Sequence, residues 1–158
     1  MSYSTRGTTR PLRLHERVSC AASTWQHLLR GLRTRGQGLR ESGAFLLGKH
    51  ERELVEITDF ILYDDLDPRV LDTGIIRFDG RYFGALWERC RAAGLDVVAD
   101  VHTHPGAAFQ SPSDQAHPMI ACAGHVALIV PNFAMPPVRV REIGMYRYLG
   151  SKKWEPLT

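Results

Sequence analysis

The stretch Asp100-Val-His-Thr-His-Pro-Gly-Ala-Ala-Phe-Gln-Ser-Pro-Ser-Asp114 decides both the fold and the chemistry that this sequence predicts. It continues an apolar, β-branched run from Leu95 to Val101, which is typical of a buried strand. Side chains two residues apart on a strand point to the same face, so His102 and His104 can converge on one point. A turn containing Pro and Gly follows and brings in Asp114. Two histidines, one carboxylate and an open fourth position are the usual ligands of catalytic zinc.

A His-x-His pair on its own is also compatible with two hydrogen-bonded core histidines. The proline directly after His104, and the Ser-x-x-Asp spacing of Ser111 and Asp114, favour the metal site. Two other histidines lie outside this pattern. His117 follows Asp114 by one helical turn and can face the same cleft, whereas His125 shows no such relation.

Together with the upstream stretch Glu41-Ser-Gly-Ala-Phe-Leu-Leu-Gly48, this pattern resembles the JAMM (MPN-type) zinc metalloproteases. The resemblance implies an α/β fold of the cytidine-deaminase-like MPN/JAMM type. It also implies a Zn²⁺ ion held by His102, His104 and Asp114, with Glu41 as general base and Ser111 stabilising the oxyanion. Members of the family cleave peptide or isopeptide bonds after the C-terminal glycines of ubiquitin-like proteins, or trim sulfur-carrier proteins.

The sequence departs from the family pattern at two places. The family commonly has ten residues between the second histidine and the aspartate, whereas positions 105–113 supply nine. The family glutamate is often followed three residues later by Gly, and that position is Ala44 here. The shorter turn must still deliver Asp114 to the metal, which the conformational freedom of Gly106 makes feasible.

Two of the implied roles have competing interpretations. Ser111 is also a good helix N-cap, with Pro112 at the first helical position and Asp114 bonding back to the cap. Glu41 is singled out as the base by the resemblance alone. Three other glutamates remain open as bases on the residues themselves: Glu51, Glu53 and Glu56.

Composition indicates an ordinary globular protein of one domain, residues 1–158, with residues 1–11 flexible. Of its 158 residues, 44% are hydrophobic and 23% charged, and the net charge is +3. The basic residues crowd the first third, but no nucleic-acid-binding motif accompanies them. The three cysteines are odd in number and far apart, and no secretory signal or membrane span is apparent. We therefore expect a cytoplasmic protein without membrane or nucleic-acid partners.

The rest of the chain alternates predicted strands and helices, which indicates an α/β fold with a mixed sheet. We expect strands at 12–20, 41–48, 54–63, 95–104, 125–131 and 138–148, with 70–78 either a further strand or partly loop. Two longer helices are capped by Ser23 or Thr24 and by Asp79, Gly94 ends the second, and a short helix covers 112–121 after the metal-ligand turn. Segments 41–48 and 54–63 predict an antiparallel hairpin whose edge receives an extended substrate.

Several functions compete for the His-x-His motif. Amidohydrolase barrels need about 250 residues, more than this chain has. Cupin-type iron sites require a glutamate a few residues after the second histidine, and none follows His104 before Asp114. A non-catalytic MPN-type scaffold within a larger complex is the main alternative, and metal content separates it from an enzyme. The expected partner is a glycine-ending tail of a ubiquitin-like or sulfur-carrier protein, with activating or conjugating enzymes encoded nearby. Maturation and deconjugation both remain open.

Overall fold

A single eight-stranded mixed sheet forms the centre of the molecule, with the strand order β1-β2-β4-β3-β5-β6-β7-β8. The computed structural model describes residues 10–74 and 76–157. The strands are β1 (Pro11–His15), β2 (Val18–Ala21), β3 (Gly43–Glu51), β4 (Leu54–Leu62), β5 (Asp96–Thr103), β6 (Val126–Val130), β7 (Gly144–Gly150) and β8 (Lys153–Pro156). The helices are α1 (Ala22–Gly36), α2 (Tyr63–Leu66), α3 (Phe83–Ala93) and α4 (Pro112–Ala116), with 3-10 turns η1 (Gly80–Tyr82), η2 (Asn132–Ala134) and η3 (Val140–Glu142).

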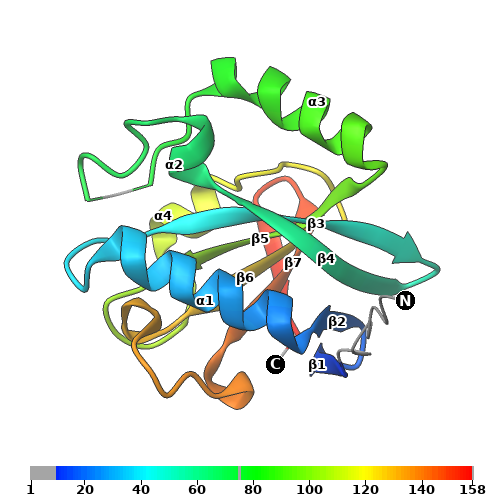
Figure 1. Cartoon of the computed structure of the whole chain (residues 1–158), viewed down its shortest axis with the longest axis horizontal. Helices are drawn as coiled ribbons and strands as arrows, with labels where there is room; N and C mark the ends of the chain where they lie inside the picture. Colours follow the sequence, from blue (N-terminus) through cyan, green and yellow to red (C-terminus); the bar gives the residue numbers. More distant parts are fainter. Residues whose placement is uncertain (1–9, 75, 158) are drawn as a thin grey trace, which may run out of the picture.

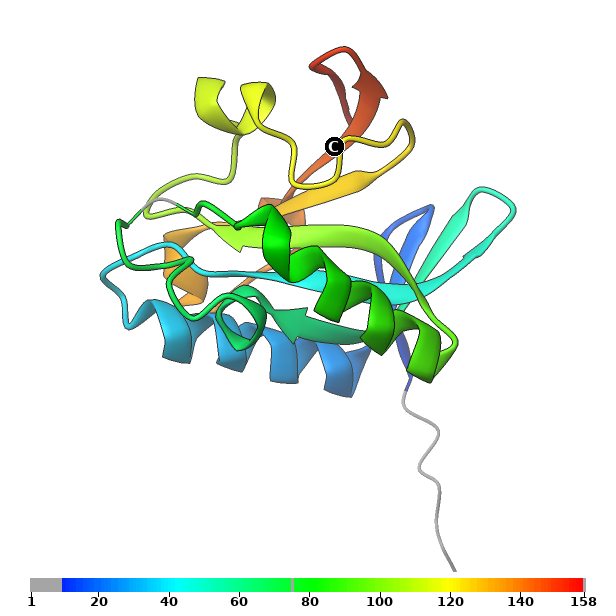
Figure 2. The same ribbon diagram turned by 90° about the horizontal axis from the view of Figure 1, so that it is seen from above.

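The two longer helices cover opposite faces of the sheet (Figures 1 and 2). Alternate residues of β3 show the division, because Ala44 and Leu46 belong to the core under α1, whereas Phe45 and Leu47 belong to the core under α3. All four are fully or almost fully buried. A strand with apolar side chains on both faces must lie inside a layered sheet. The central position of β3 follows from this pattern.

Strand β3 places its first residues beside the histidines of β5. The two strands pair antiparallel, with Gly43 opposite His102. A Cβ atom at Gly43 would lie 2.3 Å from the ring of Tyr63 and 2.7 Å from the carbonyl oxygen of Val101. Only glycine fits this position, so the ring of Tyr63 can pack directly over the start of β3.

The predicted hairpin of β3 and β4 is confirmed, but its predicted role as an edge is wrong. Strand β4 pairs with β2 on its other side, and β3 pairs with β5. In the strand order both strands therefore lie inside the sheet, with the pairing of β2 and β4 spanning Val55–Ile57. The outer strands of the sheet are β1 and β8.

Several boundaries differ from the sequence predictions. The single strand predicted at 12–20 is two strands, β1 and β2, separated by a turn at Glu16 and Arg17. Helix α1 begins at Ala22, and its N-cap residue Ala21 makes no side-chain cap, so neither Ser23 nor Thr24 is the cap. Pro11 begins β1, and residues 1–9 of the segment 1–11 that was predicted to be flexible lie outside the described residues.

The second half of the chain shows similar corrections. The described residues of 70–78 form turns and irregular backbone, and no strand. Helix α4 ends at Ala116 because Pro118 disfavours helical backbone at the residue before it. The last predicted strand begins at Gly144, after the 3-10 turn η3, and β8 was not predicted.

Two predicted helix ends are confirmed. The side chain of Asp79 accepts a hydrogen bond from the backbone N–H of Arg81 at 3.0 Å and caps the turn that leads into α3. Gly94 ends α3 in the left-handed conformation, with φ of 66°. Among the helices of the described residues, none combines the length and apolarity needed to cross a membrane.

Candidate metal centre

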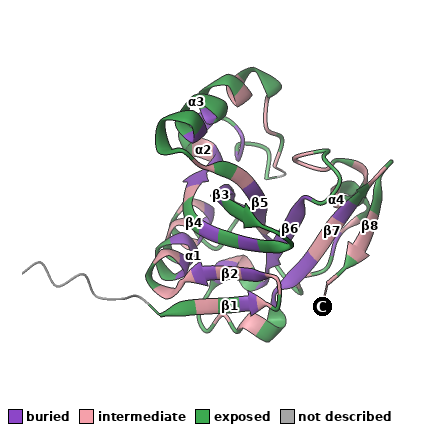
Figure 3. Cartoon of the chain, turned by 90° about the vertical axis from the view of Figure 1, so that its right-hand side faces the viewer, coloured by how far each residue is buried: buried purple, intermediate pink, exposed green. Residues whose placement is uncertain are grey.

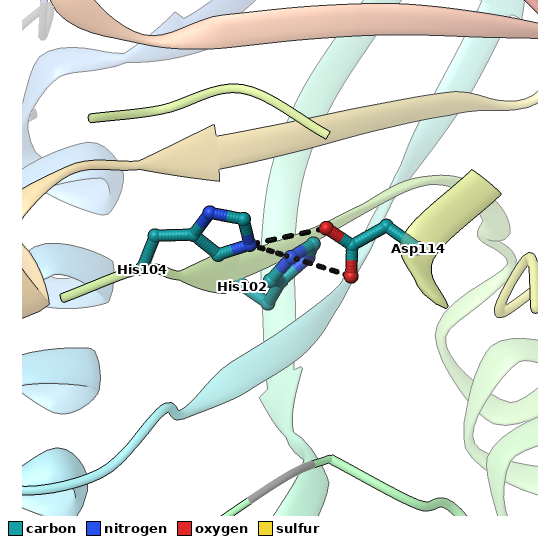
Figure 4. A group of neighbouring side chains, drawn as sticks. All are labelled: His102, His104 and Asp114. Atoms are coloured by element: carbon teal, nitrogen blue, oxygen red, sulfur yellow. Dashed lines mark hydrogen bonds and ion pairs between the residues drawn. The ribbon is translucent and has the colours of Figure 1, made fainter. Parts of the chain in front are cut away.

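Three side chains predicted as metal ligands converge at the end of β5 (Figure 4). The Nε2 atoms of His102 and His104 are 2.9 Å apart. The carboxylate of Asp114 lies 3.1 Å from His104 Nε2 through Oδ2 and 3.4 Å from His102 Nε2 through Oδ1. Tetrahedral ligands at about 2.0–2.1 Å from a metal ion are about 3.3 Å from one another. The three donor atoms are therefore spaced as ligands of one small ion.

The charges of the three side chains support one another. Burial alone would raise the pKa of Asp114, but hydrogen bonds with His102 and His104 outweigh it and hold this pKa well below its usual range. Burial alone would lower the pKa of His102, but the hydrogen bond and charge of Asp114 raise it overall. A carboxylate that is ionised and half-buried beside two imidazoles is suited to a cation, whose binding would release any proton held there.

Helix α4 brings Asp114 to the histidines although the connecting turn has nine residues. The hydroxyl of Ser111 accepts a hydrogen bond from the backbone N–H of Asp114 at 3.1 Å. In return, Asp114 Oδ2 accepts one from the backbone N–H of Ser111 at 2.8 Å. The helix cap is therefore present, and Asp114 faces the histidines at the same time. In the described hydrogen bonds the Ser111 hydroxyl acts only as an acceptor, so its proton can still be donated.

The backbone after His104 is held by an unusual turn. His104 donates its N–H to Val130 on β6 at 3.0 Å, and its carbonyl oxygen accepts from the N–H of Phe133 at 2.8 Å. The N–H of Asn132 reaches the carbonyl oxygen of Gly106 at 3.1 Å. Asn132, Phe133 and Ala134 all have positive φ, between 52° and 60°. Left-handed backbone in three successive residues other than glycine costs free energy, and here it aims two N–H groups at the ligand turn.

Glu41 lies directly before β3, close to the candidate ligands. The backbone N–H of Thr103 donates to the carbonyl oxygen of Ser42 at 2.9 Å, and the N–H of Ser42 donates to the side-chain hydroxyl of Thr103 at 3.0 Å. These bonds extend the contact of β3 and β5 beyond Gly43 and His102. If the same antiparallel register is continued by one more residue, Glu41 lies opposite His104. Burial raises the pKa of Glu41, and the nearby histidines lower it in part. A half-buried carboxylate with a raised pKa is a stronger base.

The other glutamates lie away from this centre. Glu51 is at the far end of β3, a strand of 9 residues, and hence about 26 Å from Gly43. Glu53 follows it in the hairpin turn and lies 3.4 Å from Arg17. Glu56 pairs with Lys49, again near that far end. Geometry therefore separates Glu41 from the three alternatives that the residues alone left open.

A buried hydrogen-bonded network behind the centre was not predicted. Asp100 accepts from His125 Nε2 at 2.6 Å and from the hydroxyl of Tyr63 at 3.3 Å, and all three side chains are buried. The period of two along β5 puts Asp100 on the same face as His102, which is the signal that could have revealed it. Its partners come from distant parts of the chain.

His117 is exposed, with Nδ1 at 3.0 Å from the carbonyl oxygen of Ser113.

A cavity opens beside the three converging side chains. His102 and Asp114 form part of its wall, and Tyr63 and Asp100 also line it. Ile76 and Trp154 add apolar surface. On another side, the ring of Phe109 stands edge-on to His104 at 6.4 Å and is 63% exposed. The centre is thus open to a ligand and flanked by aromatic and aliphatic side chains.

Solved structures share the fold at low sequence identity. The solution structure of protein DSY2949 from Desulfitobacterium hafniense superposes with a TM-score of 0.64 and 15% identity, covering 87% of each chain. A protein from Salinibacter ruber superposes with a TM-score of 0.57 and 17% identity, covering 87% of this chain and 86% of that one. At such identity the comparison concerns the fold alone.

Sequence comparison adds a distant relative. No protein-family model matches the chain. A protein of Sinorhizobium fredii named "Probable metalloprotease y4jG" is 26% identical over 135 residues, which are 85% of this chain and 81% of that protein. Its name fits a metal-dependent hydrolase, and so does the group of His102, His104 and Asp114.

Proposed function

We propose that this protein is a zinc-dependent hydrolase of the JAMM type, with the MPN/JAMM fold. One observation carries the proposal. Two imidazole Nε2 atoms and one carboxylate converge within 2.9–3.4 Å, beside an open cavity. The donor set of nitrogen and oxygen suits Zn²⁺, and three protein ligands leave a coordination position for chemistry. The name of the distant relative supports the same conclusion.

Each residue then has a defined task. The bound ion would polarise the scissile carbonyl and make a water molecule nucleophilic at neutral pH. Glu41 takes a proton from the attacking water and returns it to the leaving amine, for which its raised pKa is suited. Ser111 donates its hydroxyl proton to the carbonyl oxygen as negative charge develops there.

Replacing Ser111 by Ala should lower kcat by about 10²–10³, because one hydrogen-bond donor to the oxyanion is lost. Loss of the N-cap should reduce the free energy of unfolding by only about 1 kcal/mol. Steady-state kinetics and thermal melting measure the two effects separately. The control is Ser113→Ala, an exposed serine two positions along α4. A Ser111→Ala variant that is less stable but fully active would restrict Ser111 to capping.

The substrate that we propose is the glycine-ending tail of a small ubiquitin-like or sulfur-carrier protein. This step rests on the resemblance of the ligand pattern, since the hairpin is not at the outer edge of the sheet. Phe109 on one side and the cavity residues on the other flank the approach to His102 and His104. A residue without a Cβ lets the backbone approach such a site closely.

A fused tail tests this substrate. A ubiquitin-like protein with a short C-terminal extension should be cut after its glycine, and changing that glycine to Val should slow cleavage about 10- to 100-fold. Mass spectrometry of the products locates the bond that is cleaved. Equal rates for the two substrates would exclude a glycine-selective site and leave a metallopeptidase of other specificity.

A non-catalytic scaffold is the alternative function. Non-catalytic MPN-type scaffold proteins keep the fold but lack the metal ligands, whereas this chain has two histidines and an aspartate close together. Stoichiometric zinc would favour the enzyme, and a chain that binds no divalent ion would favour the scaffold.

A further inference from the structure

The C-terminal hairpin of β7 and β8 lies against the segment that carries Asp114 (Figure 3). The indole N–H of Trp154, on β8, donates to the carbonyl oxygen of Gln115 at 3.1 Å. The hydroxyl of Tyr146, on β7, accepts from the backbone N–H of Gln110 at 3.3 Å. One bond therefore holds the loop before α4, and the other holds α4 at the residue after Asp114.

The same hairpin touches the ligand turn at a third point. A Cβ atom at Gly144, the first residue of β7, would lie 2.1 Å from the carbonyl oxygen of Ala108. The backbones of the turn and of β7 are therefore in direct contact, at a place where any side chain would force them apart. Three separate contacts thus run along the loop and helix from residue 108 to residue 115.

Apart from the contacts of Asp114 with His102 and His104, helix α4 has few features of its own that would fix its position. It is only 5 residues long, and none of them is buried. Its capping box joins Ser111 to Asp114 and so stabilises the helix internally without attaching it to the sheet. A helix this short is not stable alone in water. Its position relative to β5 must come from the surrounding contacts.

The hairpin of β7 and β8 is itself attached to the sheet, so it can fix the position of α4. The ring of Trp154 packs edge-on against Tyr148 at 4.9 Å, and Tyr148 is buried. Strand β7 pairs with β6, and β6 pairs with β5, which carries His102. The sheet therefore connects the histidine ligands to the side chains that hold α4.

We propose that Trp154 and Tyr146 are positioning residues that set the affinity of the metal centre by fixing Asp114 opposite the two histidines. The inference rests on the proposed metal site but assigns a role to residues outside it. A metal ligand that is free to shift binds less tightly, and loss of supporting hydrogen bonds around metal ligands lowers affinity by about 10- to 100-fold in other proteins.

The variant Trp154→Phe tests the proposal, because it keeps an aromatic ring near Tyr148 while it removes the N–H donor together with part of the indole. Its zinc dissociation constant, from competition with a chelator, should rise about tenfold over the wild type. The absorption bands of the Co²⁺-substituted protein should change, since they report ligand geometry. The melting temperature of the metal-free protein should stay close to that of the wild type. Tyr146→Phe should act in the same direction.

The matched control is Trp87→Phe on α3, another partly exposed tryptophan, which stacks on Phe83 instead. It should leave zinc affinity and the Co²⁺ spectrum unchanged. If the wild type binds zinc and both Trp154→Phe and Tyr146→Phe bind it equally well, the hairpin does not position Asp114. If the wild type itself binds no zinc, the proposed metal centre fails instead.

Discussion

Glu41→Gln should abolish nearly all hydrolysis while zinc content and fold remain as in the wild type. The amide has the size of the carboxylate but cannot accept a proton from water, and proton transfer by a placed side chain contributes about 10²–10⁴ in rate. Glu41 lies outside the three converging ligands, so its replacement should leave them in place. Single-turnover kinetics with a fused ubiquitin-like tail measures the loss, and elemental analysis measures the zinc.

The control for this variant is Glu51→Gln, at the far end of β3, the strand that follows Glu41. It makes the same chemical change and should cleave at the wild-type rate. A Glu41→Gln protein with wild-type activity would remove Glu41 from the mechanism, and the base would then have to be another group near the cavity. Loss of zinc together with activity would instead make Glu41 part of the metal environment.

His104→Ala should remove both the metal and the activity. Two of the three donor atoms would remain, and the carboxylate of Asp114 would lose its partner at 3.1 Å. Two protein ligands are too few to hold the ion, because catalytic zinc normally has three. The measurement is zinc per chain after dialysis, together with the rate of tail cleavage.

The control for the histidine is His117→Ala. His117 is exposed and contacts Ser113 rather than the converging side chains, although it lines the same cavity. It should retain zinc. Equal zinc losses for the two variants would indicate non-specific binding by surface histidines and contradict the assignment of His104.

The local part of the candidate centre could be predicted from the sequence. The period of two on a strand puts His102 and His104 on one face, and the Ser-x-x-Asp helix start limits where Asp114 can point. These are short-range constraints, and the structure brings the three side chains together. Glu41 is different, because its place beside His104 depends on the pairing of β3 with β5 across distant parts of the chain. Only the resemblance to a family identified it.

The errors have a common physical origin in long-range contacts. The alternation of apolar and polar side chains predicts a hairpin, but it does not indicate which other strands pair with the two strands of that hairpin. The sequence therefore suggests an edge position for β3 and β4, whereas both lie inside the sheet. Strand β8 is four residues long and half-exposed, which leaves a weak pattern in the sequence. The contact of Trp154 with α4 and the pairing of Asp100 with His125 likewise join segments that no local rule connects.

Metal content tests the central claim most directly. Protein purified without added chelator should contain one zinc ion per chain by elemental analysis, and Asp114→Asn, which keeps the shape of the side chain and removes its charge, should contain much less. This result would establish that His102, His104 and Asp114 form a metal centre. A wild-type protein that takes up no divalent ion even from excess zinc, or an Asp114→Asn variant with full zinc content, would contradict it.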